Sequence, residues 1–160
     1  MKEGMKSGPD AVWSLVAKIG TAMLVTRNGE SFDARPLQAY PDPAAGEITF
    51  MTDSERVISE VNSDGRVLLT LMDKAGNNYV SLTGKAVVSN DRERIKRLWT
   101  AWALAYWKSA HDPAIRLIVV RPEQARYWDA PNPVAATVAM LAGALSGKTP
   151  KLGTSGEVEL

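Results

Sequence analysis

The connections between the apolar segments of this chain are short, which favours antiparallel strands over parallel ones. Arg27-Asn28-Gly29-Glu30 and Lys74-Ala75-Gly76-Asn77 each separate two β-prone runs, and Asn-Gly is a strong hairpin signal. Parallel strands need a crossover of a dozen or more residues, which these connections do not provide. The sequence therefore predicts an antiparallel sheet. Its expected strands are residues 21–26, 31–40, 47–52, 66–72, 78–88 and 115–120.

Helical patterns flank these strands. Helices are expected from Pro9 to about Ile19, after a cap at Asp53 or Ser54, from Asp91 through Tyr106, and from Asn132 to near Gly147. The fold class is therefore mainly β with flanking helices, as a six-stranded antiparallel barrel that is closed or split. The expected divisions are an N-terminal extension (1–8), a barrel domain (9–130), a C-terminal helix (131–147) and a flexible tail (148–160).

Composition excludes several kinds of site. The 160 residues include no cysteine and one histidine, His111. Cysteine-ligated metal sites, thiolate nucleophiles, disulfides and a two-histidine relay are therefore excluded. The formal net charge of +1 gives no field for nucleic acid or an anionic membrane, and residues 134–145 are too few to cross a bilayer, which takes about 20 residues. We expect a cytoplasmic protein with neither nucleic acid nor membrane as a partner.

Arg35 is the first candidate site residue. It stands between Ala34 and Pro36 in an apolar strand. It either pairs with a carboxylate such as Asp33 or Glu47, or binds phosphate through its planar guanidinium. Position alone leaves both open. Pro36 denies the sheet one donor, so this part of the strand is expected at an edge, at a bulge or against a ligand.

Arg56 lies in the first turn of the helix that is expected after Thr52 and Ser54. The helix dipole is positive there and disfavours a cation, unless an anion binds at the helix start. Glu55 partly neutralises the position, so a solvated helix terminus remains the alternative. With Arg35 one hairpin away, two arginines and two hydroxyls predict a site for a phosphorylated cofactor.

Aromatic residues supply candidate stacking surfaces. Trp99 and Trp102 follow a helical stripe and are expected in the core. Trp107 and Trp128 each end a segment, so they either stack on a planar ligand or fill a subunit interface. Glycine spacing gives neither a Walker loop nor a dinucleotide fingerprint.

Seven short motifs follow one another along residues 10–130. They are Ala34-Arg35-Pro36-Leu37-Gln38, Ile48-Thr49-Phe50-Met51-Thr52, Ser54-Glu55-Arg56-Val57, Tyr79-Val80-Ser81-Leu82-Thr83-Gly84-Lys85-Ala86, Asp91-Arg92, Leu98-Trp99 and Arg126-Tyr127-Trp128-Asp129. As an ordered set they resemble the general stress protein family of the pyridoxamine 5′-phosphate oxidase-like superfamily, whose members are FMN-binding split β-barrels. The chain's Arg56 stands where family members usually carry lysine.

The resemblance implies a homodimer with two FMN sites at the subunit interface. Arg35, Thr52, Ser54 and Arg56 would hold the FMN phosphate and ribityl chain. Arg35→Ala and Arg56→Ala are each expected to weaken FMN binding with little loss of fold.

The resemblance also implies how the flavin ring is held. The backbone of Pro36 and Leu37 would lie along the ring, and Phe50 and Met51 would complete the pocket wall. The second subunit would supply aromatic cover, with Trp128 as the first candidate and Trp107 as the next. The substrate-binding C-terminal motif of true pyridoxamine 5′-phosphate oxidases is absent, so oxidation of vitamin B6 is not expected.

The leading functional hypothesis is an FMN-dependent oxidoreductase of unknown substrate that is linked to stress response. The residues equally allow an FMN-binding or redox-sensing protein without turnover, and a split barrel that uses a deazaflavin. Haem is disfavoured, because the lone histidine lies in a predicted turn and no cysteine can ligate iron. No side chain stands out as a proton donor, so the sequence assigns no catalytic residue.

Overall fold

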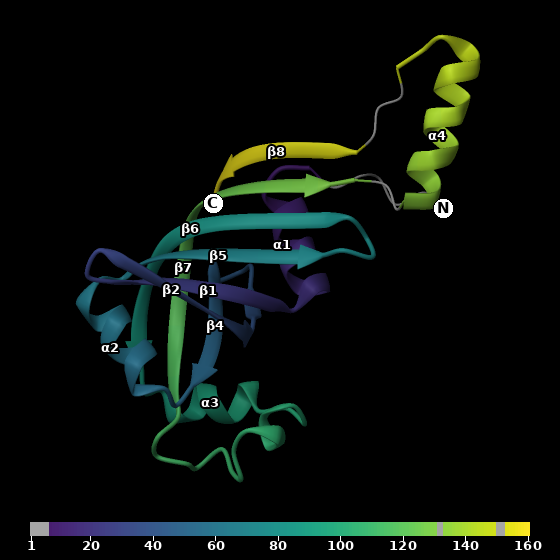
Figure 1. Ribbon diagram of the computed structural model, residues 1–160. Helices are drawn as coiled ribbons and strands as arrows, with labels where there is room; N and C mark the ends of the chain where they lie inside the picture. Colours follow the sequence, from purple (N-terminus) through teal and green to yellow (C-terminus); the bar gives the residue numbers. More distant parts are fainter. Residues whose placement is uncertain (1–6, 131–132, 150–152) are drawn as a thin grey trace.

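A computed structural model describes residues 7–130, 133–149 and 153–160. It shows a curled antiparallel sheet flanked by helices (Figure 1). The strands are β1 (Thr21–Asn28), β2 (Ser31–Gln38), β3 (Tyr40–Asp42), β4 (Glu47–Thr52), β5 (Arg66–Asp73), β6 (Asn78–Ser89), β7 (Arg116–Asp129) and β8 (Thr154–Glu159). The helices are α1 (Pro9–Ile19), α2 (Glu55–Ser63), α3 (Arg92–Leu98), the 3₁₀ turn η1 (Ala103–Ala105) and α4 (Pro133–Ser146).

The long strand β7 organises the sheet. The strand order is β2-β1-β5-β6-β7-β4-β3, and β8 also pairs with β7. Residues 116–120 of β7 pair with β4, residues 124–129 pair with β8, and β6 runs beside both parts. The sheet therefore forks at β7. Between Thr83 and Gly84 the register shifts so that Gly84 lies opposite Pro122, and such a bulge bends and twists a strand.

The curled sheet encloses the main core. Phe50, Leu24, Leu69 and Leu82 are fully or almost fully buried, and α1 covers the sheet with Val12 and three other apolar residues. A second, smaller cluster lies between β4, the start of β7 and the segment after α3. Because one cluster covers each face of β4, every residue of that strand is buried.

The barrel is split between β2 and β4. The chain passes from β2 through Ala39 into β3, and β2 also contacts β4. Within the described residues no hydrogen-bonded ladder joins β2 to β4, so β2 is an edge strand at this seam. A seam of this kind leaves the outer edge of β2 free to border a ligand.

The predicted fold class is confirmed, with two strands more than the six expected. The short β3 follows β2, and β8 lies where a flexible tail was predicted. Val158 and Leu160 explain the difference at the C-terminus, because they pack on the main core while β8 pairs with β7. The expected N-terminal extension lies mostly outside the described residues, as does Asn132, the predicted start of the last helix.

Two predicted element ends are corrected and two caps are confirmed. The strand predicted to close at Arg121-Pro122 continues to Asp129, because Pro122 lies at the bulge, where a missing donor is tolerated. The helix from Asp91 ends at Leu98 rather than Tyr106, since Trp99 has extended backbone with ψ 123°. Ser54 and Asp91 accept hydrogen bonds from Val57 N and Arg94 N and cap their helices as expected.

None of the helices that the structure describes combines the length and hydropathy required to span a membrane.

Gly84 is predicted to be essential for the bend in β6. A Cβ at this position would meet the backbone of Arg121 and Pro122, which cannot move aside without breaking the β6–β7 ladder. We expect Gly84→Ala to lower the free energy of unfolding by about 1–3 kcal/mol, the usual cost of overpacking. Urea unfolding measures this. Thr83→Ala, at the exposed neighbouring position, is the control and should cost far less; equal effects would contradict the role assigned to the bulge.

Candidate functional site

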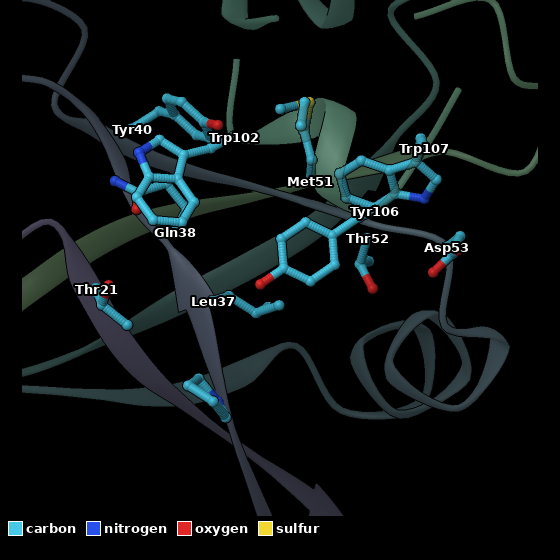
Figure 2. A pocket seen from close by; sticks show the side chains of 12 residues that line it. Thr21, Leu37, Gln38, Tyr40, Met51, Thr52, Asp53, Trp102, Tyr106 and Trp107 are labelled. Atoms are coloured by element: carbon cyan, nitrogen blue, oxygen red, sulfur yellow. The ribbon is translucent and has the colours of Figure 1, made fainter. Parts of the chain in front are cut away.

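A cavity of about 330 Å³ opens at the seam of the barrel (Figure 2). Ligand pockets are typically about 300–1,000 Å³, so it is large enough to hold a small molecule. Its walls come from the strand ends around the seam and from the segment that follows α3. The lining residues are Thr21, Pro36, Leu37, Gln38, Tyr40, Met51, Thr52, Asp53, Trp102, Ala103, Tyr106 and Trp107.

The strand side of the cavity follows from the geometry of the seam. Pro36 and Leu37 lie on the edge strand β2, so the missing donor of Pro36 leaves no interior ladder broken. This confirms the expectation that Pro36 lies at an edge. Opposite, Met51 and Thr52 end β4, and side chains alternate along a strand. Met51 therefore lines the cavity while its neighbour Phe50 points into the main core, where it is fully buried.

The other side of the cavity is aromatic. Figure 2 shows the rings of Trp102, Tyr106 and Trp107 around the same space as Leu37 and Thr52. The Tyr106 and Trp107 ring centroids are 5.8 Å apart, a distance typical of paired aromatic rings. The Trp107 Nε1 atom is buried and has no hydrogen-bond partner among the described residues. A buried donor without an acceptor is rare in proteins, and this one belongs to a cavity-lining residue.

Arg35 and Arg56 meet in one cluster of charged side chains beside the cavity. Arg35 Nη2 lies 2.8 Å from Glu60 Oε2 and 3.0 Å from Asp33 Oδ2. Arg56 Nη2 lies 2.9 Å from the same Asp33 oxygen, and Arg56 Nε lies 2.9 Å from Glu60 Oε1. Thr26 Oγ1 donates to Glu60 Oε2 and accepts from Arg35 Nη1. We call these five residues the ion cluster. Its two arginines and two carboxylates give the cluster a net charge of zero.

Glu60 is the centre of the ion cluster and is only 6% exposed. Burial by itself raises the pKa of a carboxyl group, but the hydrogen bonds from Thr26, Arg56 and Arg35 outweigh it and hold the Glu60 pKa below its ordinary value. The carboxylate therefore stays charged at neutral pH. Since Glu60 lies on α2 and Arg35 on β2, the cluster fixes the helix against the edge strand.

Hydroxyl groups gather where β4 passes into α2. Thr52 Oγ1 accepts from Ser54 N at 3.1 Å, and Ser54 Oγ accepts from Val57 N at 3.4 Å. Thr52 and Asp53 line the end of the cavity, so the start of α2 adjoins it. The Arg56 side chain in the first turn is 64% exposed, whereas that of Arg35 is 17% exposed. Only Arg56 is therefore readily reached from solvent.

The structure brings together most of the residues that the sequence singled out. Five of them line the cavity: Pro36, Leu37, Met51, Thr52 and Trp107. Arg35 and Arg56 belong to the adjoining ion cluster, and Ser54 caps α2 between them and the cavity. The alternative partner Asp33 does contact Arg35, while Glu47 pairs with Arg94 and Arg121 instead.

Two of the predicted residues lie away from the cavity. Phe50 is in the main core, so it supports the wall from behind rather than forming it. Trp128 is 45% exposed and lines a second, shallow concavity on the outer face of the sheet. The predicted burial of Trp102 is wrong. This residue was expected in the core, but it is 72% exposed at the cavity because α3 ends before it.

Sequence reasoning missed the cavity-lining role of Gln38, Tyr40 and Asp53. Gln38 directly follows Leu37, and Asp53 directly follows Thr52, so their positions next to predicted site residues were the available signal. Tyr40 begins β3, a strand that the proline-rich sequence there concealed.

Comparison with known proteins identifies the family. The sequence model described as pyridoxamine 5′-phosphate oxidase like matches residues 9–151. The chain belongs to this family. A search of the curated proteins found no match.

Solved structures extend the family likeness to the fold. A candidate general stress protein 26 from Jannaschia sp. CCS1 is 21% identical and superimposes with a TM-score of 0.78 over 93% of this chain and 95% of that chain. The general stress FMN/FAD binding protein from Xanthomonas citri is 24% identical, with a TM-score of 0.64 over 72% of this chain and 84% of that chain. A pyridoxamine 5′-phosphate oxidase-related, FMN binding protein from Nostoc punctiforme PCC 73102 is 12% identical, with a TM-score of 0.55 over 78% of this chain and 87% of that chain. At these identities the similarity establishes a shared split-barrel fold.

The ion cluster predicts a pH-dependent stability. Because the pKa of Glu60 in the folded chain lies below its ordinary 4.5, the stability that Glu60 contributes is complete above that pH and is lost as the pH falls through the folded pKa. We expect Glu60→Gln to lower the free energy of unfolding at pH 7 by about 3 kcal/mol, since it removes one member of a buried ion pair. Between roughly pH 5 and pH 3 the free energy of unfolding should fall less in this variant than in the unmodified chain, because the variant has no Glu60 carboxylate to protonate.

Denaturant unfolding across this pH range measures both effects. Glu123→Gln is the control, because Glu123 is exposed and its pair with Lys85 is long, at 3.6 Å. An equal loss in the two variants would contradict the role assigned to the ion cluster.

Proposed function

We propose that the cavity binds FMN and that the chain is an FMN-dependent oxidoreductase linked to stress response. The proposal rests on what the seam brings together. There a cavity with an aromatic wall adjoins a helix start that bears two hydroxyls and an accessible arginine. A flavin mononucleotide has the matching parts, a planar ring and a terminal phosphate. The names of the Xanthomonas citri and Nostoc punctiforme relatives, which include FMN binding, support the same ligand.

The donors at the seam fit such a ligand. The unpartnered Trp107 Nε1 would gain an acceptor from a polar group in the cavity. Arg56 uses Nε and Nη2 in the ion cluster, and a guanidinium carries five N–H donors, so donors remain for an anion. The positive end of α2 adds to this attraction.

Each residue would contribute to binding in a different way. Arg56, Ser54 and Thr52 would hold the phosphate and the sugar chain, while Pro36 and Leu37 would provide a flat strand edge for the ring. Trp107 would cover the ring from the other side within the same chain. When bound, FMN supplies the electron transfer, and the protein supplies binding, orientation and exclusion of water.

Arg35 acts on phosphate binding mainly through its neighbours. Its side chain is largely buried, and its guanidinium already contacts Thr26, Asp33 and Glu60. It therefore positions Glu60, and Glu60 in turn orients Arg56. Asp33 also contacts Arg56, so an incoming phosphate would compete with this carboxylate for the arginine.

The cavity offers few groups that could transfer a proton. The lining residues include the carboxylate of Asp53 and the phenols of Tyr40 and Tyr106, but no lysine or histidine. A binding or redox-sensing protein without turnover therefore remains the second candidate. A deazaflavin, whose phosphate would meet the same groups, is the alternative cofactor. Reduction of the bound flavin by NADH or NADPH, followed by reoxidation with an acceptor, would favour the enzyme.

We also propose a homodimer with the cofactor at the subunit interface. The cavity is bordered by Trp102 and Tyr106, which are 72% and 75% exposed. Met72 and Trp128 are exposed on the outer face of the sheet. Exposed aromatic and apolar groups beside a cavity are typical of an interface that a second subunit covers. Trp128 would then act across the interface.

Arg56→Ala is predicted to weaken FMN binding at least about tenfold, because a charge-assisted hydrogen bond contributes about 1.5–3 kcal/mol. Because its side chain is largely exposed, this variant should lose less stability than Arg35→Ala, and the loss it does show comes from the contact with Glu60. Arg35→Ala should weaken binding and also lower stability, because it leaves Glu60 buried with fewer partners. Fluorescence titration with FMN, together with thermal unfolding, measures the two effects separately.

Arg66→Ala is the matched control, since Arg66 is exposed on β5 and far from the seam in the sheet order. Unchanged FMN affinity in both the Arg35 and the Arg56 variants would contradict the proposed site. Sedimentation should show a dimer; a monomer that still binds FMN would contradict the proposed interface.

A further inference from the structure

The helix α4 is an uncharged helix that projects from the sheet (Figure 1). Its residues 133–146 include no Asp, Glu, Lys or Arg. Five large apolar side chains are between 53% and 91% exposed: Val134, Val138, Met140, Leu141 and Leu145. An exposed apolar patch of this kind on a protein surface usually marks an interaction site.

Four of these five exposed residues lie along one face of α4, and Met140 lies outside that face. Val134, Val138, Leu141 and Leu145 follow one another at spacings of four, three and four residues, which places them along one side of a helix. The other positions of the helix carry mainly small residues, and Gly143, opposite this face, is buried. The helix therefore presents a stripe of Val and Leu side chains to a partner, with Met140 exposed outside the stripe.

The ends of α4 are attached at one end of β7. The helix leaves after Asp129, and the returning strand β8 starts at Thr154, which pairs with Asp129. The segment with Trp102, Leu104 and Tyr106 precedes the other end of β7, beyond α3. Figure 1 shows α4 and α3 at opposite ends of the molecule. While β8 stays paired, α4 therefore lies away from the aromatic segment of its own chain.

A third apolar surface lies between these two. The shallow concavity on the outer face is lined by Met23, Met72, Tyr79 and Trp128, and it shares Thr21 with the seam cavity. Trp128 also directly precedes Asp129, where α4 is attached. Among the described residues, eleven of the thirteen exposed large hydrophobic side chains belong to α4, this concavity or the aromatic segment. The three surfaces follow one another from α4 to the seam cavity.

We propose that α4 is an arm that covers the seam cavity of a second copy of this chain. A two-fold axis through the outer-face concavity would place α4 of each copy over Trp102, Leu104 and Tyr106 of the other. Both contacts are then equivalent, and the assembly is closed at two copies. The inference rests on the proposed homodimer and adds a function for α4, which is to exclude water from the partner's site.

The properties of α4 favour this occupant over others. Without charged residues the helix has no attraction for nucleic acid, for an anionic membrane or for a charged peptide. A helix of 14 residues is about 21 Å long, less than the bilayer core of about 30 Å. Eleven apolar residues from each copy would supply the centre of a standard interface, which has about 20–30 residues a side.

Cross-linking tests the arm directly, because the chain has no cysteine of its own. Leu141→Cys and Leu104→Cys chains with different tags are coexpressed, loaded with FMN and treated with a short bis-maleimide. A cross-link between the two chains is expected at least tenfold above the control, in which Phe32→Cys replaces Leu104→Cys. Phe32 is 72% exposed and lies at the start of β2, away from the seam.

A second pair, Val138→Cys with Tyr106→Cys, guards against a local defect at one position and is expected to cross-link too. A dimer that binds FMN but forms neither cross-link would overturn the arm and leave the proposed function intact. Efficient cross-linking between two Leu141→Cys chains would also overturn the arm. So would binding of the Leu141→Cys chain to phosphatidylcholine vesicles without any cross-link to Leu104→Cys. A monomer that binds no FMN would overturn both proposals.

Discussion

The carboxylate of Glu60 is the interaction on which the geometry of the seam depends. Strand β2 has no hydrogen-bonded neighbour on its outer side in the described part of the chain, so sheet pairing alone does not fix its position beside β4. Glu60 on α2 receives Arg35 from β2 and Thr26 from β1, and it also orients Arg56. At the open seam, the ion pairs and hydrogen bonds of the ion cluster therefore fix β2, where no hydrogen-bonded ladder joins it to β4.

The same arrangement explains how a site arises there. Charge pairing holds β2 in place while its edge, with Pro36 and Leu37, stays accessible. On the other side the chain leaves the helical path at Trp99 and folds its aromatic residues over the end of β4. The cavity therefore lies between a fixed strand edge and an aromatic wall, next to the start of α2. A planar, phosphorylated ligand is the kind of molecule that such a space suits.

Local signals predicted the elements well, and long-range contacts produced the differences. The Asn-Gly turn and the caps at Ser54 and Asp91 are encoded within a few residues, and each is found as expected. Phe50 could not be separated from Met51, because β4 is buried on both faces and its sequence shows no alternation. β8 was missed because its small polar residues become a strand only through β7. Arg35 and Arg56 do meet, but no local signal indicated that Glu60 would lie between them.

The most direct test of the account is the visible absorption spectrum of the purified chain after incubation with excess FMN and exhaustive dialysis. The account predicts retained flavin at one molecule per chain, with the flavin bands shifted from those of free FMN because the ring lies against Trp107 and the edge of β2. A chain that emerges folded and colourless, with all FMN in the dialysate, would contradict it.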